Sequence, residues 1–294
     1  MAKFLCNYVN GKWVETGRTF ANVNPANGSR ICDASEADQA TVDQAVKGAR
    51  AAMAGERGHM STVDRSALGL QAFDQLVTTR RSIRRFTDRP VSKKLLLEIL
   101  DIAGRAPSNS NMQPWRVYVV GGAAKDKLAQ ALSDAHQKSP ADYQPERPMY
   151  APNLPAPYSD RLQLFGRVFY GALGIDRADM EARGRYIARN LIFFDAPIAA
   201  FFTVDRRMEV SSWFDCGLFA QTFMLAAKAR GLDTCAQIFL TKYHTVVRRH
   251  LPIDETQIIA CGMSIGYADT SSVEYTIDIP RIPVNEFASI VGLE

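Results

Sequence analysis

The stretch RRSIRRFTDRP, residues 80–90, restricts the fold and chemistry of this chain more than any other segment. Five arginines surround Ser82, and Ile83 and Phe86 lie between them. Several guanidinium groups beside a hydroxyl can hold a phosphate through charge-assisted hydrogen bonds, and the interleaved apolar residues predict a partly buried turn. A solvated basic face or a nucleic-acid patch would have the same composition, so both alternatives stay open here.

A second polar segment, APSNSNMQPW (106–115), follows a short distance downstream. Its short hydrogen-bonding side chains lie between Pro107 and Pro114, and they are Ser108, Asn109, Ser110, Asn111 and Gln113. Such a run predicts a rigid loop that could present donors and acceptors to a flat heterocycle. An ordinary turn between a helix and a strand would have similar residues, and this alternative also stays open.

Apolar periodicity and turn residues predict interleaved helices and strands without a strict βαβ repeat, so we expect an α+β fold. Thr41, Ser61 and Ser92 are expected helix caps, and Asn-Gly steps predict turns within a β-like segment over 7–31. Residues 139–160 are rich in proline and tyrosine and predict a long ordered loop. We expect helices over 41–53, after Ser61, and over 93–106, 175–195 and 213–231, strands over 115–122, 197–204 and 257–267, and a strand or turn over 235–240.

Composition places the chain among ordinary globular proteins, with 294 residues, 47% apolar and 22% charged. It predicts one large domain, or one domain with an appendage. No apolar run is long enough to span a bilayer, and we expect neither a secretory signal nor a membrane location, but a cytoplasmic one. The five scattered cysteines predict free thiols, the four histidines have no metal-ligand spacing, and the net charge of +4 suits small anionic ligands.

One motif suggests a different chemistry. Residues 262–266, GMSIG, match G-x-S-x-G, the nucleophile turn of α/β-hydrolases. That motif requires a helix directly after the serine, whereas YADTSSVEY follows here and predicts none. We therefore expect Ser264 to lie on a packed strand rather than act as a nucleophile.

Several segments, in order along the chain, resemble the FMN-dependent nitroreductase family. They are RRSIRRF, the block from PVS to NMQPW, NLIFFDAPIAAFF, GLFAQTFMLAAKARGLDTC, CGMSIGYAD and the late arginine of PRIPVNEF. Each is weak alone, but together they cover roughly three quarters of the chain, from about residue 72 to the end. The resemblance implies an α+β sandwich with a central antiparallel or mixed sheet. It also implies a homodimer with FMN at the subunit interface.

The resemblance also implies roles for individual residues. Arg80 and Arg281 would hold the FMN phosphate, and Arg84 would lie near the N1–C2 edge of the flavin. The remaining implied FMN contacts are Arg81, Ser82, Pro107, Ser108, Asn109, Asn111, and the turn Gln237, Ile238 and Phe239, whose backbone N–H would face N5. Relatives often carry an acidic residue and a glycine in that turn, so Ile238 and Phe239 depart from the pattern. Arg189 or Asn190 would add a polar contact.

The implied chemistry belongs to FMN, with no side-chain acid, base or metal. NADPH or NADH would donate a hydride and leave, and a nitroaromatic acceptor would follow in a ping-pong cycle, through nitroso to hydroxylamine. The expected substrate pocket contains Ser110, Tyr150 and Phe239. Tyr143, Tyr150 and Tyr158 mark a loop that could cover this pocket, although surface packing is the simpler interpretation for at least two of them. A quinone or enone reductase of the same fold and a non-catalytic flavin-binding scaffold are the alternatives.

The N-terminal segment resembles a different family. NYVNGKWVE, the NPANG turn, VDQAVKGARAAM and MSTVDRSAL are similar to the start of aldehyde dehydrogenases, closest to those acting on muconic-type semialdehydes. That family's catalytic cysteine and glutamate have no counterpart here. We therefore predict a non-catalytic appendage over 1–70 and an FMN-binding nitroreductase domain over 71–294, joined by gene fusion. The appendage points to a pathway of aromatic degradation, with nitrobenzene or a chloronitrobenzene as substrate.

Overall fold

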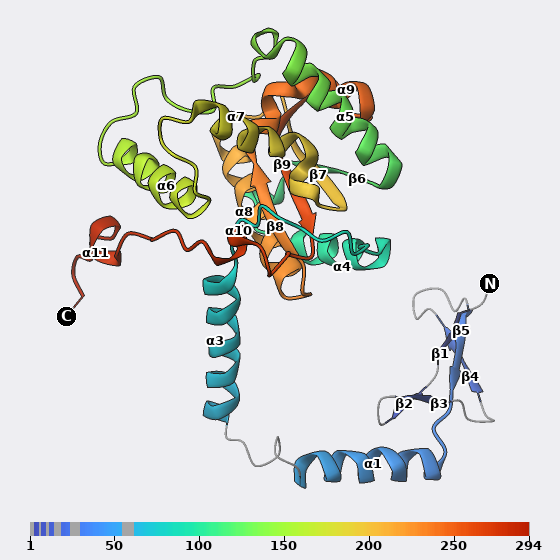
Figure 1. Ribbon diagram of the computed structural model, residues 1–294. Coiled ribbons are helices and arrows are strands. Elements are labelled where there is room, and N and C mark those ends of the chain that lie inside the picture. Colours follow the sequence, from blue (N-terminus) through green and yellow to red (C-terminus); the bar gives the residue numbers. More distant parts are fainter. Residues whose placement is uncertain are drawn as a thin grey trace. The chain divides into compact units, whose positions relative to one another are not determined.

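The computed structural model describes residues 3–5, 7–9, 12–14, 19–23, 30–54 and 62–293. They form two compact units, Met1–Gln75 and Leu76–Glu294 (Figure 1). In the first unit, β5 (Arg30–Ser35) pairs in parallel with β1 (Lys3–Leu5) and antiparallel with β4 (Thr19–Val23). Strands β2 (Asn7–Val9) and β3 (Lys12–Val14) form a separate antiparallel pair.

Helix α1 (Gln39–Ala54) follows β5, and α3 (Thr62–Thr79) leads into the second unit. The prediction that Thr41 caps α1 is wrong. The carboxylate of Asp38 accepts hydrogen bonds from both the backbone N–H and the hydroxyl of Thr41, each at 2.7 Å, so Asp38 caps the first turn. The predicted cap Ser61 and the Asn-Gly turns at 10–11 and 27–28 lie outside the described residues.

The second unit is built on a four-stranded sheet of order β6-β7-β9-β8 (Trp115–Gly121, Ile198–Asp205, Gln257–Gly266 and Asp233–Gln237). All three neighbouring pairs are antiparallel, and helices connect the strands, which confirms the predicted α+β class. The helices are α4 (Lys93–Ala103), α5 (Gly122–Lys138), α6 (Tyr158–Ala172), α7 (Met180–Ala188), α8 (Val210–Lys228), α9 (His244–His250), α10 (Val273–Thr276) and α11 (Val284–Phe287), with 3-10 turns η1 (Asn109–Asn111), η2 (Pro140–Asp142), η3 (Arg189–Asp195) and η4 (Ile238–Tyr243).

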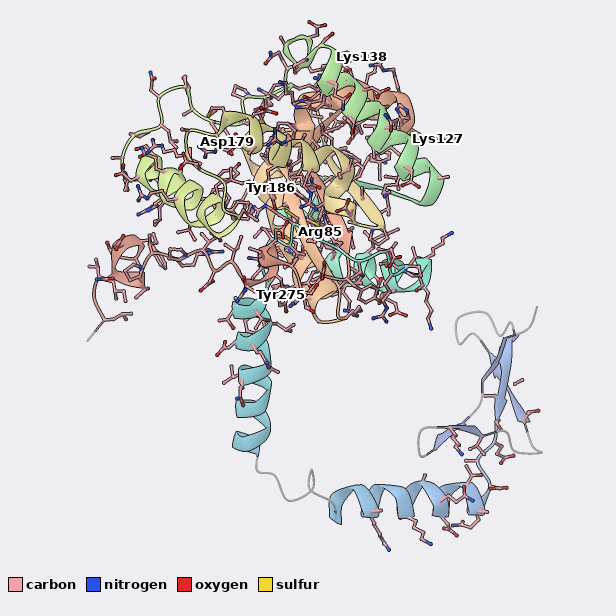
Figure 2. The ribbon with its side chains drawn as sticks, in the orientation of Figure 1. Arg85, Lys127, Lys138, Asp179, Tyr186 and Tyr275 are labelled. Carbon is pink, nitrogen blue, oxygen red and sulfur yellow. The ribbon has the colours of Figure 1, made fainter. Side chains whose placement is uncertain are left out.

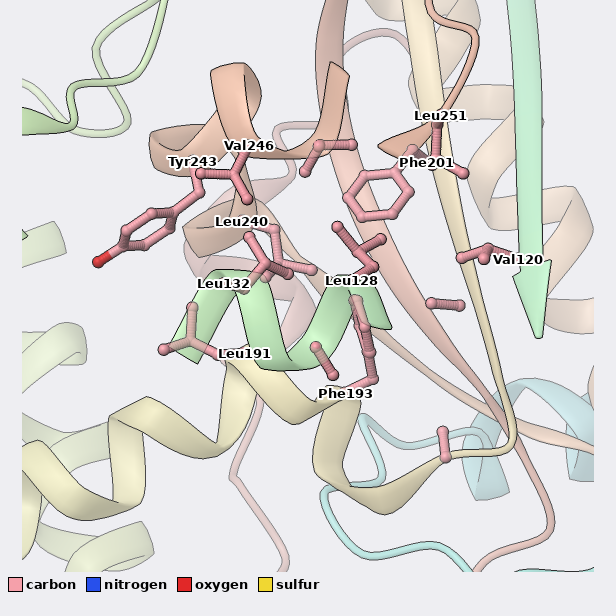
Figure 3. Packing of buried hydrophobic residues seen from close by; sticks show 14 of the residues in the cluster. Val120, Leu128, Leu132, Leu191, Phe193, Phe201, Leu240, Tyr243, Val246 and Leu251 are labelled. Atoms are coloured by element: carbon pink, nitrogen blue, oxygen red, sulfur yellow. The ribbon is translucent and has the colours of Figure 1, made fainter. Parts of the chain in front are cut away.

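Successive side chains of β7 point to opposite faces of the sheet, because side chains alternate along a strand. Phe201 is fully buried on the face covered by α5 and α9, where Leu128 and Leu132 pack (Figure 3). Phe202 is fully buried on the other face, 5.8 Å from the ring of Phe219 on α8. Helices therefore cover both faces of the sheet, which explains why the sequence of β7 is apolar at almost every position.

The predicted helix over 175–195 is wrong at both ends, because α7 begins only at Met180. Helix α7 stops at Ala188, and the chain continues as η3, in which Phe193, Phe194 and Asp195 have φ of 55°, 53° and 69°. Both phenylalanines are almost completely buried, so packing into the core outweighs the local helical preference. The segment 235–240, predicted as strand or turn, contains the end of β8 and the start of η4.

Candidate functional site

The arginine-rich stretch runs beside the edge of the sheet, held by its own backbone. The N–H of Ile83 donates to the carbonyl of Thr234 on β8 at 3.1 Å, and that of Phe86 donates to the carbonyl of Phe194 at 3.3 Å. Ile83 and Phe86 are buried, as the sequence predicts for a partly buried turn. Arg80, Arg81 and Arg84 are half-buried and Arg85 is exposed, so these side chains lie outside the core.

Four arginines and Ser82 line one pocket of about 540 Å³, here called the arginine pocket, and this volume is within the usual range for small-molecule sites. Its lining residues are Val77, Thr78, Arg80, Arg81, Ser82, Arg84, Phe165, Phe169, Gln221, Glu274, Ile277, Asp278, Ile279 and Arg281. Arg80, Arg81, Ser82, Arg84 and Arg281, all expected from the sequence, are thus brought together. With two carboxylates against four guanidinium groups, the lining carries an excess of positive charge.

Arg80 and Arg281 lie close enough to repel each other. Burial lowers the pKa of Arg80, and the charge of Arg281 lowers it further. Among the described residues, no carboxylate forms an ion pair with either guanidinium. Two like charges facing one space without a counterion are suited to an anion that carries more than one negative charge.

The C-terminal segment reaches this pocket because Arg81 anchors it. The guanidinium of Arg81 donates to the carbonyl of Tyr275 at 2.9 Å, 194 residues away in the sequence. Figure 2 labels Tyr275 together with Arg85 and Tyr186, which belong to the same region of the fold. Arg81 therefore shapes the pocket in addition to lining it.

Arg84 lies against aromatic rings of α6. Its guanidinium is 4.7 Å from the ring centroid of Phe169 and 5.6 Å from that of Phe165, within the range of cation–π attraction. These rings fix the position of the charge at one wall of the pocket. Sequence reasoning missed both phenylalanines, because residues up to 160 were predicted as a loop and α6 was not predicted.

Glu274 on α10 was also missed, since nothing near it in sequence marks it as part of a site. Its carboxylate accepts a hydrogen bond from Arg189 at 2.8 Å, and Arg189 also pairs with Asp195 at 2.9 Å. The hydroxyl of Tyr186 lies 3.4 Å from Glu274, and burial followed by the Glu274 charge raises the pKa of Tyr186 well above its ordinary value. Arg189 is therefore engaged with carboxylates and does not line the arginine pocket.

Residues 107–113 do not line the arginine pocket. Pro107, Ser108 and Asn109 line a separate pocket of about 360 Å³ against the N-terminal half of α8. The N–H of Asn109 donates to the buried carboxylate of Asp215, and the hydroxyl of Ser108 accepts from the N–H of Gln113 at 3.0 Å. Exposed Ser110 and Asn111 have positive φ of 49° and 56°, so the loop has a defined and unusual backbone.

The turn after β8 divides its side chains between the core and the surface. The buried amide of Gln237 donates to the backbone carbonyl of Asn190 at 3.0 Å and accepts from Ser264 at 2.5 Å. Ser264 is fully buried on β9, which confirms that it packs on a strand. Phe239 packs against the core beside Tyr243, whereas Ile238 is 44% exposed and faces a third pocket.

That third pocket, of about 480 Å³, is largely apolar and lies between the proline- and tyrosine-rich loop and strand β9. It is lined by Arg147, Pro148, Met149, Glu209, Val210, Trp213, Ile238, Thr241, Ile259 and Ala260. Tyr150 is 62% exposed next to it, whereas Tyr143 packs 5.2 Å from the ring of Tyr243. Tyr158 begins α6 and lies under Arg161, so two of the three tyrosines have ordinary packing roles.

Cys235 is a cysteine whose pKa is affected by arginines of the arginine pocket. Burial raises the pKa of Cys235 to about 11, although Arg84 and Arg80 act against it, so the thiol is neutral near pH 7. Within the described ranges, no three His, Cys, Asp or Glu side chains are grouped as metal ligands. None of the helices in those ranges is long and apolar enough to cross a membrane.

Residues 77–267 match the model of the nitroreductase family, and the chain belongs to that family of enzymes. It is 42% identical to nitrobenzene nitroreductase of Ectopseudomonas oleovorans, over 74% of this chain and 96% of the relative. It is 40% identical to 4-nitrobenzoate reductase of Pseudomonas putida, over 78% and 99%. The crystal structure of FMN-dependent nitroreductase NfnB from Mycobacterium smegmatis in complex with NADPH matches with a TM-score of 0.73 and 34% identity, over 76% of this chain and 99% of that chain.

The N-terminal resemblance is also found. Residues 13–103 match the model of the aldehyde dehydrogenase family. Over 68 residues, the chain is 46% identical to 2-hydroxymuconic semialdehyde dehydrogenase of Pseudomonas sp. (strain CF600). This stretch covers 22% of the chain but only 14% of that relative, which confirms the predicted similarity to dehydrogenases of muconic-type semialdehydes.

Proposed function

We propose that this chain is an FMN-dependent NAD(P)H nitroreductase that reduces small nitroarenes. The arginine pocket is the observation that carries the proposal. Arg80 and Arg281 line it together, and neither forms an ion pair with a carboxylate of the described residues, so both charges suit a phosphate monoester of nearly two negative charges. Arg84, fixed on Phe165 and Phe169, and the hydroxyl of Ser82 supply further donors, so the residues present fit FMN.

Bound FMN would supply hydride transfer, first from a nicotinamide and then to a nitro group, in a ping-pong cycle. The chain's own residues bind and orient. Arg80 and Arg281 would hold the phosphate, and Arg84 would place a positive charge near the N1–C2 edge of the ring. The turn 237–239 would offer a backbone N–H to the flavin, and the Gln237 side chain holds that turn against Asn190 and Ser264.

The proposed acceptors are nitrobenzene and chloronitrobenzenes, reduced through the nitroso compound to the hydroxylamine. The similarity to nitrobenzene nitroreductase supports this choice. Trp213, Ile238 and Ile259 give the third pocket the apolar walls that an uncharged ring needs. Ile238 replaces Phe239 as the residue of the turn expected to contact the acceptor, because Phe239 packs inward. Ser110 and Tyr150, both exposed, remain proposed contacts.

A homodimer would complete the FMN site. Gln221 of α8 lines the arginine pocket, whereas Phe214 of the same helix lines the pocket of the 107–109 loop, about 10 Å away along the axis. Phe214 is 68% exposed and Val210 is 82% exposed, which is unusual for so apolar a helix. A two-fold axis crossing α8 would bury both and bring the loop over Pro107–Asn111 of one copy to the arginines of the other.

The first 70 residues are proposed to be a non-catalytic remnant of a gene fusion, followed by the FMN-binding domain over 71–294. The similarity to only 14% of the semialdehyde dehydrogenase supports this, and the unit boundary after Gln75 lies close to the proposed junction. A cytoplasmic location accords with this metabolic role.

The absorbance spectrum of the purified protein tests the proposal. We expect a yellow protein whose flavin absorbance is bleached by NADPH under anaerobic conditions and restored by nitrobenzene. Restoration by quinones but not by nitrobenzene would indicate a quinone reductase. Tight FMN without bleaching would indicate a flavin-binding scaffold, and a colourless protein with salt-sensitive DNA retention would indicate nucleic-acid binding.

A further inference from the structure

A fourth hollow, of about 560 Å³, lies over α6 and the start of α7 and is not part of the site described above. Its lining residues are Leu162, Gln163, Gly166, Arg167, Tyr170, Gly171, Gly174, Ile175, Asp176, Arg177 and Arg183. Three of them are glycines, which leave backbone accessible, and three are arginines. The hollow therefore combines space with a concentration of positive charge.

These arginines are not neutralised by ion pairs. In the described part of the chain, Arg167, Arg177 and Arg183 form no salt bridge, although neighbouring Arg161 and Arg185 do. Arg183 lies 4.3 Å from the ring centroid of Tyr170 and donates to the carbonyl of Arg177 at 3.2 Å, which fixes its guanidinium at the wall. Three cations against one carboxylate leave a charge of about +2, which matches a phosphate monoester near pH 7.

The lone carboxylate is already engaged. Asp176 accepts a hydrogen bond from the backbone N–H of Ala178 at 2.7 Å, and the next carboxylate, Asp179, caps α7 through Ala182. Both acidic groups thus hold the turn before α7, close to Arg177. The arginine side chains remain available to a ligand.

The position of this hollow relates it to the arginine pocket. Phe165 and Phe169 of α6 face the arginine pocket, whereas Leu162, Gly166 and Tyr170 of the same helix face the hollow. The two spaces therefore lie on adjoining faces of one helix about 10 Å thick. A ligand whose one end meets a flavin held in the arginine pocket could therefore place its other end in the hollow.

Resting on the proposed function, we propose that the hollow binds the adenosine 2′-phosphate of NADPH and makes the enzyme select NADPH over NADH. The 2′-phosphate is the only group by which the two donors differ, and it is a dianionic monoester. The arginine fork suits such a group through paired hydrogen bonds. The adenine would have Tyr170 as its aromatic neighbour in the lining.

The test compares Arg167→Ala/Arg177→Ala with Arg185→Ala in the full-length protein. Arg167 and Arg177 are exposed and Arg185, paired with Glu181, lies outside the hollow, so the control removes a charge from the same region. We expect kcat/KM for NADPH to fall by about tenfold or more in the double variant, with that for NADH changed less than twofold. The control should leave both values unchanged.

Calorimetry with adenosine 2′,5′-bisphosphate provides a readout independent of turnover. We expect the full-length protein to bind it at least about tenfold more tightly than AMP, and the double variant to lose this preference. Equal loss for NADPH and NADH, no loss for either, or equal binding of AMP would overturn the proposal. If neither nicotinamide bleached the flavin, the proposed function would fail, whereas the calorimetry would still report on this site.

Discussion

Replacing Arg281 with alanine should weaken FMN binding but leave riboflavin binding unchanged. Arg281 is an exposed residue of the C-terminal segment, and its guanidinium donates to the nearby carbonyl of Ile279 at 2.7 Å. Its removal therefore takes away a charge from the pocket without removing core packing. Riboflavin lacks only the phosphate, so the comparison isolates that group.

The size of the effect follows from the environment of the two arginines. A hydrogen bond to a charged group contributes about 1.5–3 kcal/mol, and exposure of Arg281 favours the lower end. The loss should be about 1.5 kcal/mol, equivalent to roughly a tenfold increase in Kd. Because Arg281 also disfavours the charged form of Arg80, its removal offsets part of this loss. Arg80→Ala, at a partly buried position, should cost more, up to about 100-fold.

Quenching of flavin fluorescence on titration into the apoprotein gives both dissociation constants. Arg89→Ala is the matched control, because Arg89 belongs to the same basic stretch but stacks on Tyr267, 3.8 Å from the ring centroid, outside the pocket. The preference for FMN should also weaken at high salt, where charges are screened. An equal loss of FMN and riboflavin affinity in Arg281→Ala would refute the assignment of this arginine to the phosphate.

Three further results are expected. Ser264→Ala leaves the buried side-chain carbonyl of Gln237 without its hydrogen-bond donor, so the free energy of unfolding, measured by urea denaturation, should fall by about 1–3 kcal/mol. The control Ser271→Ala, at an exposed position, should lower it by less than about 0.5 kcal/mol. Unchanged stability of Ser264→Ala would contradict the buried hydrogen bond. Burial would raise the pKa of Glu146, but hydrogen bonds from Arg206 and Arg248 outweigh it and hold that pKa below 4.5. The stabilisation by the ionised carboxylate is therefore complete above about pH 4.5 and is lost as the pH falls further. In Glu146→Gln the free energy of unfolding should fall less steeply below pH 4.5 than in the unmodified protein, and an identical slope would exclude this role. Deleting residues 1–70 should leave FMN content and nitrobenzene turnover within about twofold of the full chain, since the pocket is lined by residues from 77 onward; loss of flavin or of the dimer would show that the appendage has become structural.

The sequence by itself determined several local elements and suggested a chemistry for the basic stretch. Ser92 accepts from the N–H of Leu95 and caps α4, as predicted, because capping depends on residues three apart. The buried strand over Ile198–Asp205 was predictable because its apolar run needs cover on both faces. The arginines around Ser82 predicted a phosphate site as one hypothesis beside a solvated basic face and a nucleic-acid patch, because side-chain chemistry alone does not define what a basic stretch faces.

Only the tertiary structure decided which distant residues share the site. Glu274 lies in the pocket of Arg80 because Arg81 binds the carbonyl of Tyr275, a contact across 194 residues that no local pattern encodes, whereas Arg281 was expected there only through the family resemblance. The positive φ values of Phe193 and Phe194 likewise follow from burial of both rings in the core, which overrides the helical tendency of the segment. Local preferences act over a few residues, whereas the pocket depends on long-range packing that determines where each segment ends.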